Sequence, residues 1–311
     1  MGDSSQAALA PAIPVLVGPT AAGKTELASG LSHAAPRPLE VISADAVMVY
    51  RGLDLGSAKP AWSVRNRVPH HLVDLLDPWE EYDAASFARD AELAIGRCLA
   101  RGHLPLVVGG TGFYVKLLIH GIPKTPKSQP ALRAQLQREL EALGADSYLE
   151  RLGLQGRISR ETLRNPHRLL RALEVYRLSG KLPGEFALSP PRYRYRLWWL
   201  DAPDLPRRIA ARAASMLENG LVAEVLQLSE PGGQALERSI NYRQTLAALR
   251  AGREVRAADL EQVNLQYARR QRTFFRSQFR LEPLGRAAVY FALLNQLNDL
   301  SPAAETAPAD E

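Results

Sequence analysis

The chain has 311 residues, 46% of them hydrophobic and 23% charged, with a net charge of +6. This suits a globular enzyme with one large α/β domain and an insertion, or with two domains. Its single cysteine, Cys98, excludes an internal disulfide and a cysteine-based zinc site. No apolar run reaches the roughly 18 residues of a membrane span, and the acidic, polar start from Met1 to Pro11 is unlike a signal peptide, so we expect a cytoplasmic protein that does not contact membranes.

Short apolar runs alternate with helical patterns in the first third of the chain. Buried strands are predicted at Ile13–Val17, Leu39–Ser43 and Leu104–Val108, because each is a short apolar run followed by glycine or small polar residues. A helix is predicted at Gly23–Leu31. Asp83 is a good N-cap for a second helix, whose apolar face would comprise Phe87, Ala91, Ala94 and Cys98, with Gly102 at its end. This alternation predicts an α/β fold in which helices cover a parallel sheet.

A glycine-rich loop follows the first predicted strand and opens the first helix. Its sequence, GPTAAGKT, fits the P-loop pattern G-x-x-x-x-G-K-[ST]. Backbone N–H groups of such a loop surround a di- or triphosphate, with the lysine against phosphate oxygens and the hydroxyl available to Mg²⁺. We therefore predict a P-loop NTPase-like sheet and a phosphate site formed by Gly18, Thr20, Ala21, Ala22, Gly23, Lys24 and Thr25, with Mg²⁺ on Thr25.

A carboxylate is placed near this loop. P-loops usually bind ATP or GTP, and a nucleoside triphosphatase normally adds an apolar strand that ends in aspartate. Here the third predicted strand ends in Gly109-Gly110-Thr111-Gly112, and the aspartate, Asp45, follows the second strand instead. Ligands of open α/β sheets bind at the carboxyl ends of the strands. Asp45 could be an ordinary cap or turn residue, but its position favours a role in the site.

The alternation stops at residue 122, and the middle of the chain is basic. From Ile122 to Arg194 there are 14 Lys and Arg against 7 Asp and Glu. No strand pattern is visible there, and one helix is predicted to start at Asn165-Pro166 and to end near Ser179, after an earlier helical repeat of Leu132, Leu136, Leu140 and Leu143. We predict a helical insertion at 122–191 between two core segments, 12–121 and 192–285. Its charge indicates either a solvated arginine-rich surface or a site for an anionic partner.

The last third returns to the α/β pattern. A strand is predicted at Arg194–Leu200, helices follow from Asp204, and a long helix begins near Asp259. On this helix one face would carry Arg269, Arg272, Arg276 and Arg280, and the opposite, packing face Val263, Tyr267, Phe274 and Leu281. The arginines form either an RNA-facing stripe or a solvated surface. Residues 1–11 and 301–311 are expected to be disordered, because their composition offers little to bury.

Five sequence blocks in this order resemble the tRNA dimethylallyltransferases, also called isopentenyl-tRNA transferases. The resemblance covers roughly residues 13 to 280, and its blocks are Ile42–Pro60, Pro69–Asp74, Val108–Tyr114, Arg168–Val175 and Gln266–Arg276. The chain departs from the family pattern at Ala46, where serine is usual, at Met48, where glutamine is frequent, and at Asn241, where glycine is usual.

The resemblance implies transfer of a dimethylallyl group from dimethylallyl diphosphate to N6 of the adenine at position 37, next to the anticodon of tRNA. It implies that Asp45 is the general base beside Thr111, and that Arg208 and Arg212 complete the diphosphate site. The implied tRNA contacts, in the anticodon stem-loop, are Asp45, Ala46, Val47, Met48, Thr111, Arg133, His167, Arg168, Arg171, Arg243, Arg269, Arg272 and Arg276. We expect the enzyme to be a monomer.

Two other functions fit the same residues. In a small-molecule kinase that uses ATP, Asp45 would deprotonate a hydroxyl group and the insertion would act as a lid. A nucleotide-switched RNA-binding protein would have no chemistry of its own. The basic insertion and the arginine-rich helix argue against the kinase, and the carboxylate beside the phosphate loop argues against the switch.

Overall fold

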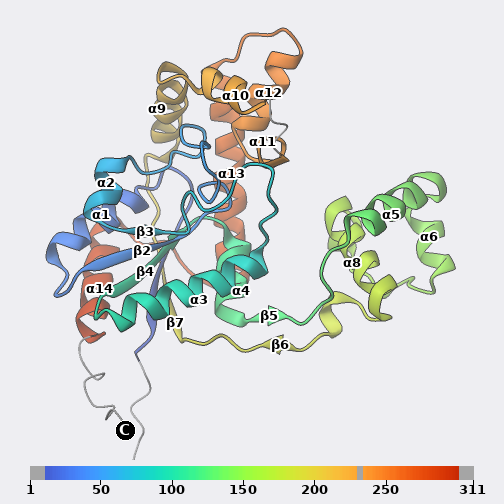
Figure 1. Ribbon diagram of the computed structural model, residues 1–311, viewed down its shortest axis with the longest axis horizontal. Helices are drawn as coiled ribbons and strands as arrows, with labels where there is room; N and C mark the ends of the chain where they lie inside the picture. Colours follow the sequence, from blue (N-terminus) through green and yellow to red (C-terminus); the bar gives the residue numbers. More distant parts are fainter. Residues whose placement is uncertain (1–10, 230–233, 301–311) are drawn as a thin grey trace, which may run out of the picture. The chain divides into compact units, whose positions relative to one another are not determined.

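A five-stranded parallel sheet forms the centre of the larger part of the molecule (Figure 1). The strand order is β3-β2-β4-β1-β7, and the strands are β1 Ile13–Val17, β2 Leu39–Ala44, β3 His70–His71, β4 Leu104–Gly109 and β7 Tyr195–Trp199. The four strands that the sequence predicts are confirmed to within a residue or so. The two-residue strand β3 was not predicted, because a run that short carries no periodicity. The α/β class is confirmed.

The computed structural model describes residues 11–229 and 234–300. The chain divides into two units, a core unit formed by residues 1–120 and 191–311 and an inserted unit, Gly121–Pro190. The predicted disordered segments, 1–11 and 301–311, lie outside the described residues except for Pro11. Within the described ranges, none of the helices is long and apolar enough to cross a membrane.

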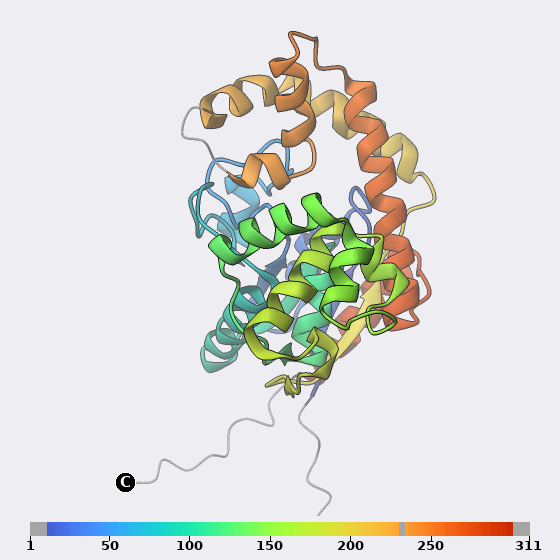
Figure 2. The same cartoon turned by 90° about the vertical axis from the view of Figure 1, so that its right-hand side faces the viewer.

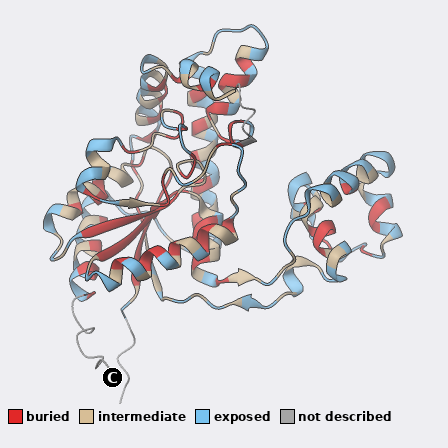
Figure 3. Ribbon diagram, viewed as in Figure 1, coloured by how far each residue is buried: buried red, intermediate tan, exposed pale blue. Residues whose placement is uncertain are grey.

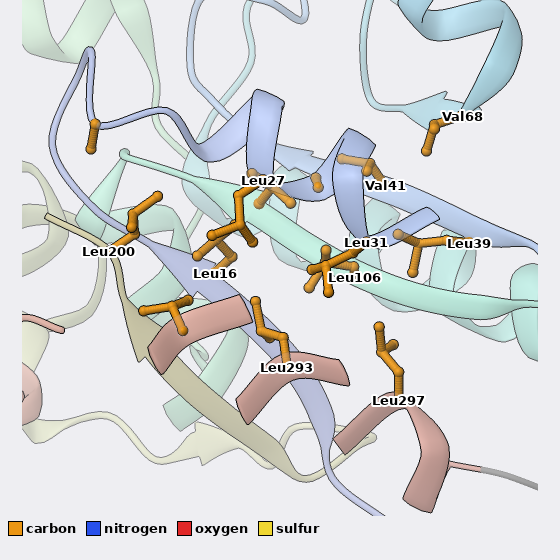
Figure 4. Close-up of a cluster of buried hydrophobic side chains, with 14 of the residues drawn as sticks. Leu16, Leu27, Leu31, Leu39, Val41, Val68, Leu106, Leu200, Leu293 and Leu297 are labelled. Carbon is orange, nitrogen blue, oxygen red and sulfur yellow. The ribbon is translucent and has the colours of Figure 1, made fainter. Parts of the chain in front are cut away.

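Helices cover both faces of the sheet. Helices α1 (Lys24–Ala34) and α14 (Arg286–Asp299) pack on one face, and α3 (Ala84–Ala100) and α4 (Gly112–His120) lie on the other (Figure 1). The strands are the most buried elements (Figure 3). Figure 4 shows the core on the α1 side, where side chains from the sheet meet those of α1 and α14, including Leu16, Leu27, Leu31, Leu106, Leu293 and Leu297.

The start of α3 is formed as its sequence predicts. The Asp83 carboxylate accepts a hydrogen bond from the backbone N–H of Ser86 at 2.7 Å, which satisfies one of the unpaired donors of the first helical turn. The predicted apolar face, Phe87, Ala91, Ala94 and Cys98, is buried. Gly102 follows the last turn with a positive φ of 70°.

The core unit contains further helices, several of which lie beyond the carboxyl ends of the strands (Figure 1). They are α2 Trp62–Arg67, α9 Leu205–Glu218, α10 Leu221–Ser229, α11 Gln234–Arg238, α12 Tyr242–Arg250 and α13 Ala257–Phe279. In a second apolar cluster, helices α9, α10, α11, α12 and α13 pack against the loop after β2. Its members include Val49, Leu53, Met216, Tyr242 and Leu260. This cluster therefore holds the loop after β2 against these helices.

The packing face predicted for the last long helix is wrong by about one residue. The buried side chains of α13 are Leu260, Asn264, Ala268, Gln271 and Phe275. Two of these are polar, and both make hydrogen bonds inside the protein. A prediction that places only apolar residues inside therefore assigns the wrong face of α13 to the core. The helix also ends at Phe279, so Arg280 and Leu281 lie beyond it, with Arg280 at a φ of 53°.

The inserted unit is mainly helical, with its own small core. Its elements are β5 Ile122–Pro123, α5 Pro130–Leu143, α6 Ala145–Arg151, α7 Arg160–Leu163, α8 Pro166–Ser179, the short 3-10 helix Pro183–Glu185 and β6 Leu188–Ser189. Leucines of α5, α6 and α8 pack together, and Figure 2 shows these helices drawn in green. Asn165 caps α8 through its bond from the N–H of Arg168, at 3.1 Å. The absence of strands predicted here is wrong, because β5 and β6 pair antiparallel.

A buried carboxylate connects β2 to β3 and to the turn before β4. The Glu40 side chain is 3% exposed and accepts hydrogen bonds from Arg101, at 2.7 and 2.9 Å, and from His71 and His103. Burial alone would raise the pKa of Glu40, but these hydrogen bonds outweigh it and lower the pKa to about 2. The charged form of Glu40 therefore stabilises the fold.

We expect Glu40→Gln to lower the free energy of unfolding at pH 7 by about 2–3 kcal/mol. Because the pKa of Glu40 is depressed on folding, its contribution is complete above the unfolded pKa of 4.5 and is lost as pH falls towards 2. Urea unfolding at pH 7 and pH 3 measures this. The gap between the two proteins should narrow at pH 3. The exposed Glu161→Gln is the control and should change stability by less than about 0.5 kcal/mol at either pH.

Candidate active site

The core unit contains a pocket of about 520 Å³ at the carboxyl ends of β1, β2 and β4. This is the edge at which ligands of open parallel sheets bind. Most of the residues predicted for the site line this pocket: Thr20, Ala21, Gly23, Lys24 and Thr25 from the phosphate loop, Asp45, Ala46, Val47 and Met48 after β2, Thr111 after β4, and Arg208 and Arg212 on α9. The other two predicted loop residues, Gly18 and Ala22, belong to the same loop but do not line the pocket.

The phosphate loop needs glycine at two positions. A Cβ on Gly18 would lie 2.2 Å from the carbonyl oxygen of Leu200, so no side chain fits there. Gly23 precedes the first residue of α1 with a φ of 89°, which is a left-handed conformation that glycine adopts readily. Together these glycines bring the loop backbone to the amino end of α1, where N–H groups and the helix dipole attract anions.

The Lys24 side chain turns back into its own loop. Its Nζ donates hydrogen bonds to the carbonyl oxygens of Gly18 at 2.9 Å and of Pro19 at 2.8 Å. Burial lowers the pKa of Lys24 to about 8; Asp45 opposes this shift and Arg212 adds to it. The ammonium group is partly buried and hydrogen-bonds only to neutral carbonyls, so a diphosphate placed beside it would supply compensating negative charge.

Two arginines of α9 approach the loop from the other side. Arg212 donates from one terminal nitrogen to Ser57 O at 3.0 Å, while its buried Nε has no hydrogen-bond partner within the described part of the chain. Burial lowers the pKa of Arg212, and Asp45 opposes that shift. Arg208 Nε donates to Ala21 O at 2.8 Å. The guanidinium groups of both arginines thus lie beside the phosphate loop, where positive charge suits an anion.

Asp45 has one engaged and one available carboxylate oxygen. Its Oδ1 accepts hydrogen bonds from the N–H groups of Val47 at 2.9 Å and Met48 at 3.3 Å. This closes the turn after β2 and fixes the side chain. Across the residues that the structure describes, Oδ2 accepts no hydrogen bond. Asp45 is therefore both a turn residue and a carboxylate that presents a free oxygen in the pocket.

Thr111 and two residues of α13 complete the wall next to Asp45. The Thr111 hydroxyl accepts from Ala46 N at 3.1 Å. Gln271 Oε1 accepts from Thr20 N at 2.8 Å, and its Nε2 donates to Gly110 O at 2.9 Å. Tyr267 also lines the pocket, and burial, followed by Asp45, raises its pKa to about 12. Its hydroxyl is therefore protonated at neutral pH and can donate.

The sequence analysis did not predict that two asparagines contribute to the pocket. Asn241 and Asn264 line the pocket. Asn241 Nδ2 donates to Gly56 O at 2.7 Å, and its Oδ1 accepts from Asn264 Nδ2 at 2.6 Å. Asn241 has a φ of 71°, a strained value for a residue with a side chain. The departure from the usual glycine was the only sequence signal for this residue.

Four arginines predicted to touch tRNA in the core unit lie away from the pocket. Arg272 is paired with Asp201 through two hydrogen bonds of 2.7 Å, so it has a structural partner. Arg276 stacks over the ring of Trp199 and lies 3.8 Å from Glu282. Arg243 and Arg269 are exposed and have no side-chain partner in the ranges that are described. Of the arginines predicted on the last long helix, Arg272 and Arg276 therefore have partners within the protein, whereas Arg269 is exposed.

The predicted tRNA residues of the inserted unit also differ in character. Arg171 donates to Glu174, whose side chain is fully buried, and to Pro126 O at 2.6 Å, so it supports the fold of this unit. Arg168 is about half exposed and pairs with Glu161. His167 is exposed and Arg133 is partly exposed. Arg133, His167 and Arg168 are thus available to a partner at lower structural cost than Arg171.

Comparison with known proteins gives consistent results. The family model for IPP transferases matches residues 48–278. The chain is 43% identical over 285 residues to the tRNA dimethylallyltransferase of Deinococcus radiodurans, covering 88% of this chain and 92% of that protein. It is 44% identical over 275 residues to the tRNA dimethylallyltransferase of Thermus thermophilus, covering 86% and 90%.

A solved structure agrees with these sequence matches. The tRNA isopentenylpyrophosphate transferase from Bacillus halodurans is 28% identical, with a TM-score of 0.65, and the match covers 94% of this chain and 98% of that one. The family resemblance carried by the five sequence blocks is confirmed. The chain belongs to the IPP transferase family.

Proposed function

We propose that the protein transfers a dimethylallyl group from dimethylallyl diphosphate to N6 of the adenine at position 37 of tRNA, acting as a monomer. The observation that carries this proposal is a phosphate loop and a carboxylate with a free oxygen in one pocket. The names of the relatives support it. Labelled dimethylallyl diphosphate incubated with unmodified tRNA tests it, because only this activity gives labelled tRNA.

The leaving diphosphate is held by the loop. Backbone N–H groups at the start of α1, the Lys24 ammonium and the Arg212 guanidinium would provide positive charge where negative charge grows as the bond breaks. Lys24 would exchange its bonds to Gly18 and Pro19 for bonds to phosphate oxygens. All of these groups belong to one chain, which is consistent with a monomer.

Thr25 fits the role of a Mg²⁺ ligand. It is the second residue of α1 and lines the pocket beside Lys24, and its hydroxyl makes no hydrogen bond to any residue that is described. A hydroxyl oxygen next to diphosphate oxygens is the donor set that Mg²⁺ prefers. When bound, Mg²⁺ would neutralise part of the charge of the diphosphate.

The acceptor amine needs a base and access. The N6 nitrogen attacks C1 of the prenyl group, the C1–O bond breaks with its electron pair going to the diphosphate, and a proton leaves N6 for Asp45 Oδ2. The hydroxyl groups of Thr111 and Tyr267 lie on the same side and can orient the base. An adenine must leave its stack to reach this depth, which costs least in an unpaired loop.

Exposed cations are proposed to hold the tRNA backbone. Arg133, His167 and Arg168 of the inserted unit and Arg243 and Arg269 of the core unit suit phosphate contacts, because they are accessible. Arg171 and Arg272 would contribute indirectly, through the carboxylates they hold. The alternative of an ATP-dependent small-molecule kinase gains no specific support from the pocket.

We expect Asp45→Asn to lower kcat by roughly 10²- to 10⁴-fold, because the amide cannot accept the amine proton. The amide oxygen can still accept from Val47 and Met48, so the turn should stay folded. Affinities for tRNA and dimethylallyl diphosphate should change by less than about tenfold. Single-turnover transfer with pre-bound substrates measures the chemical step directly.

Two outcomes would argue against this role of Asp45. Near-normal single-turnover transfer by the folded Asn variant would remove Asp45 as the base. Recovery of most of the rate with added Mg²⁺ would make Asp45 mainly a metal ligand. Neither result would by itself remove the transferase assignment, which the labelling experiment tests.

We expect Lys24→Ala to weaken binding of dimethylallyl diphosphate by about 10- to 100-fold, the cost of losing one or two charge-assisted hydrogen bonds. Binding of tRNA, measured on filters, should change by less than about threefold. The matched control is Lys116→Ala. Lys116 bonds to Gln278 outside the pocket at 2.7 Å, and its loss should leave both affinities unchanged. A comparable loss of tRNA affinity in the Lys24 variant would contradict the assignment of Lys24 to the diphosphate and not to the tRNA.

We expect the double change Arg133→Gln and Arg168→Gln to reduce the salt dependence of tRNA binding. For each tRNA phosphate that these side chains no longer neutralise, the slope of log K against log[salt] should flatten by roughly 0.7–0.9. Arg256→Gln, in the core unit and paired with Asp259, is the control. Binding isotherms at several KCl concentrations measure the slopes. An unchanged slope in the double variant would make this face of the inserted unit a structural surface only.

A further inference from the structure

Part of the pocket is a recess between α1 and the strands β2, β3 and β4, next to the phosphate loop. We define the recess by Ala28, Val41, Ser43, His70 and Val108, all of which line the pocket. Strand register places them together: His70 pairs with Val41, and Ser43 with Val108. Paired residues of neighbouring strands point to the same face. Because Val41 and Val108 belong to the core on the α1 side, Ser43 and His70 also face α1.

The recess is mostly apolar and begins close to the phosphate loop. Ala28 lies four residues, or about 6 Å, along α1 from Lys24. The wall near Asp45 is polar instead, because Thr111, Tyr267 and Gln271 present hydroxyl and amide groups. A substrate with an anionic end and a short hydrocarbon tail matches the loop and the recess. A purine matches the polar wall, which can hydrogen-bond to its edge.

His70 forms a fixed end of the recess. Its Nδ1 lies 2.6 Å from the carbonyl oxygen of Val68. A carbonyl only accepts, so Nδ1 carries the proton and the ring is held in one orientation. Burial lowers the pKa of His70; the bond to Val68 opposes this, and Arg65 and His71 add to it. The ring is therefore neutral at neutral pH and can lie against hydrocarbon without an unpaired charge.

The adjacent histidine has the opposite environment. His71 follows His70 in β3, so its side chain points to the other face of the sheet. There it bonds to the buried carboxylate of Glu40. The two neighbouring histidines thus separate into one that supports the fold and one that borders the pocket. This difference supplies a matched pair for an experiment.

We propose that the recess receives the hydrocarbon tail of the prenyl donor and that His70 closes it, so that His70 limits the chain length of the donor. The inference rests on the proposed prenyl transfer and adds to it a residue that determines substrate specificity. A five-carbon tail would end against the imidazole ring. A ten-carbon tail would need the space that the ring occupies.

The test compares dimethylallyl diphosphate with geranyl diphosphate as donors, using full-length protein and the same tRNA. We expect His70→Ala and His70→Val to raise the ratio of kcat/KM for geranyl over dimethylallyl diphosphate by at least about tenfold, the discrimination typical of apolar pockets. His70→Phe should keep the preference for the shorter donor. His71→Ala should lose thermal stability without changing the ratio, which controls for a general loosening of the fold.

A second control addresses the other apolar part of the pocket, near Ile240 and Ala211. If Ile240→Ala changes the donor ratio and the folded His70 variants do not, the tail lies there and the inference is overturned. Equal use of both donors by the unaltered protein would overturn it as well. Failure of the unaltered protein to transfer from dimethylallyl diphosphate to tRNA would instead reject the proposed function.

Discussion

One buried amide group joins the two loops that form the floor of the pocket. Gln271 accepts from Thr20 in the phosphate loop and donates to Gly110 after β4, so α13 fixes the separation of these loops. The bonds continue from Gly110 to its neighbour Thr111, whose hydroxyl accepts from Ala46. The turn that carries Asp45 is therefore linked to the phosphate loop by hydrogen bonds of Gln271 and Thr111 and by the peptide bond between Gly110 and Thr111. The proposed diphosphate site and the proposed base are thus connected by one continuous set of contacts.

Short-range patterns were enough to predict much of this site. The phosphate loop is defined by eight consecutive residues between a strand and a helix. Asp45 and Thr111 follow apolar runs, and parallel strands bring their carboxyl ends to one edge. Asp83 and Asn165 cap helices within three residues of themselves. The phosphate loop and the two caps have causes within a few residues along the chain, and the meeting of Asp45 and Thr111 follows from the general rule for parallel strands.

Other parts depend on partners that are distant along the chain. Gln271 and Asn264 are polar residues that a hydrophobic pattern places outside, yet both are buried, with partners as far away as Thr20. The same limitation applies to the arginines. Nothing near Arg272 indicates that it pairs with Asp201, and Arg171 differs from Arg168 because Glu174 is buried beneath it. His70 lies in a strand too short to predict, so its face could not be assigned.

The strained backbone at Asn241 links two positions in how they can change. Glycine, usual at this place in the family pattern, would adopt a φ of 71° without strain. It would also remove the amide that bonds to Gly56 and to Asn264, just before the start of α12. The strain at Asn241 is thus offset by the hydrogen bonds of its own side chain. Because the two side chains are in direct contact, we expect the effects of substitutions at positions 241 and 264 on stability to be non-additive.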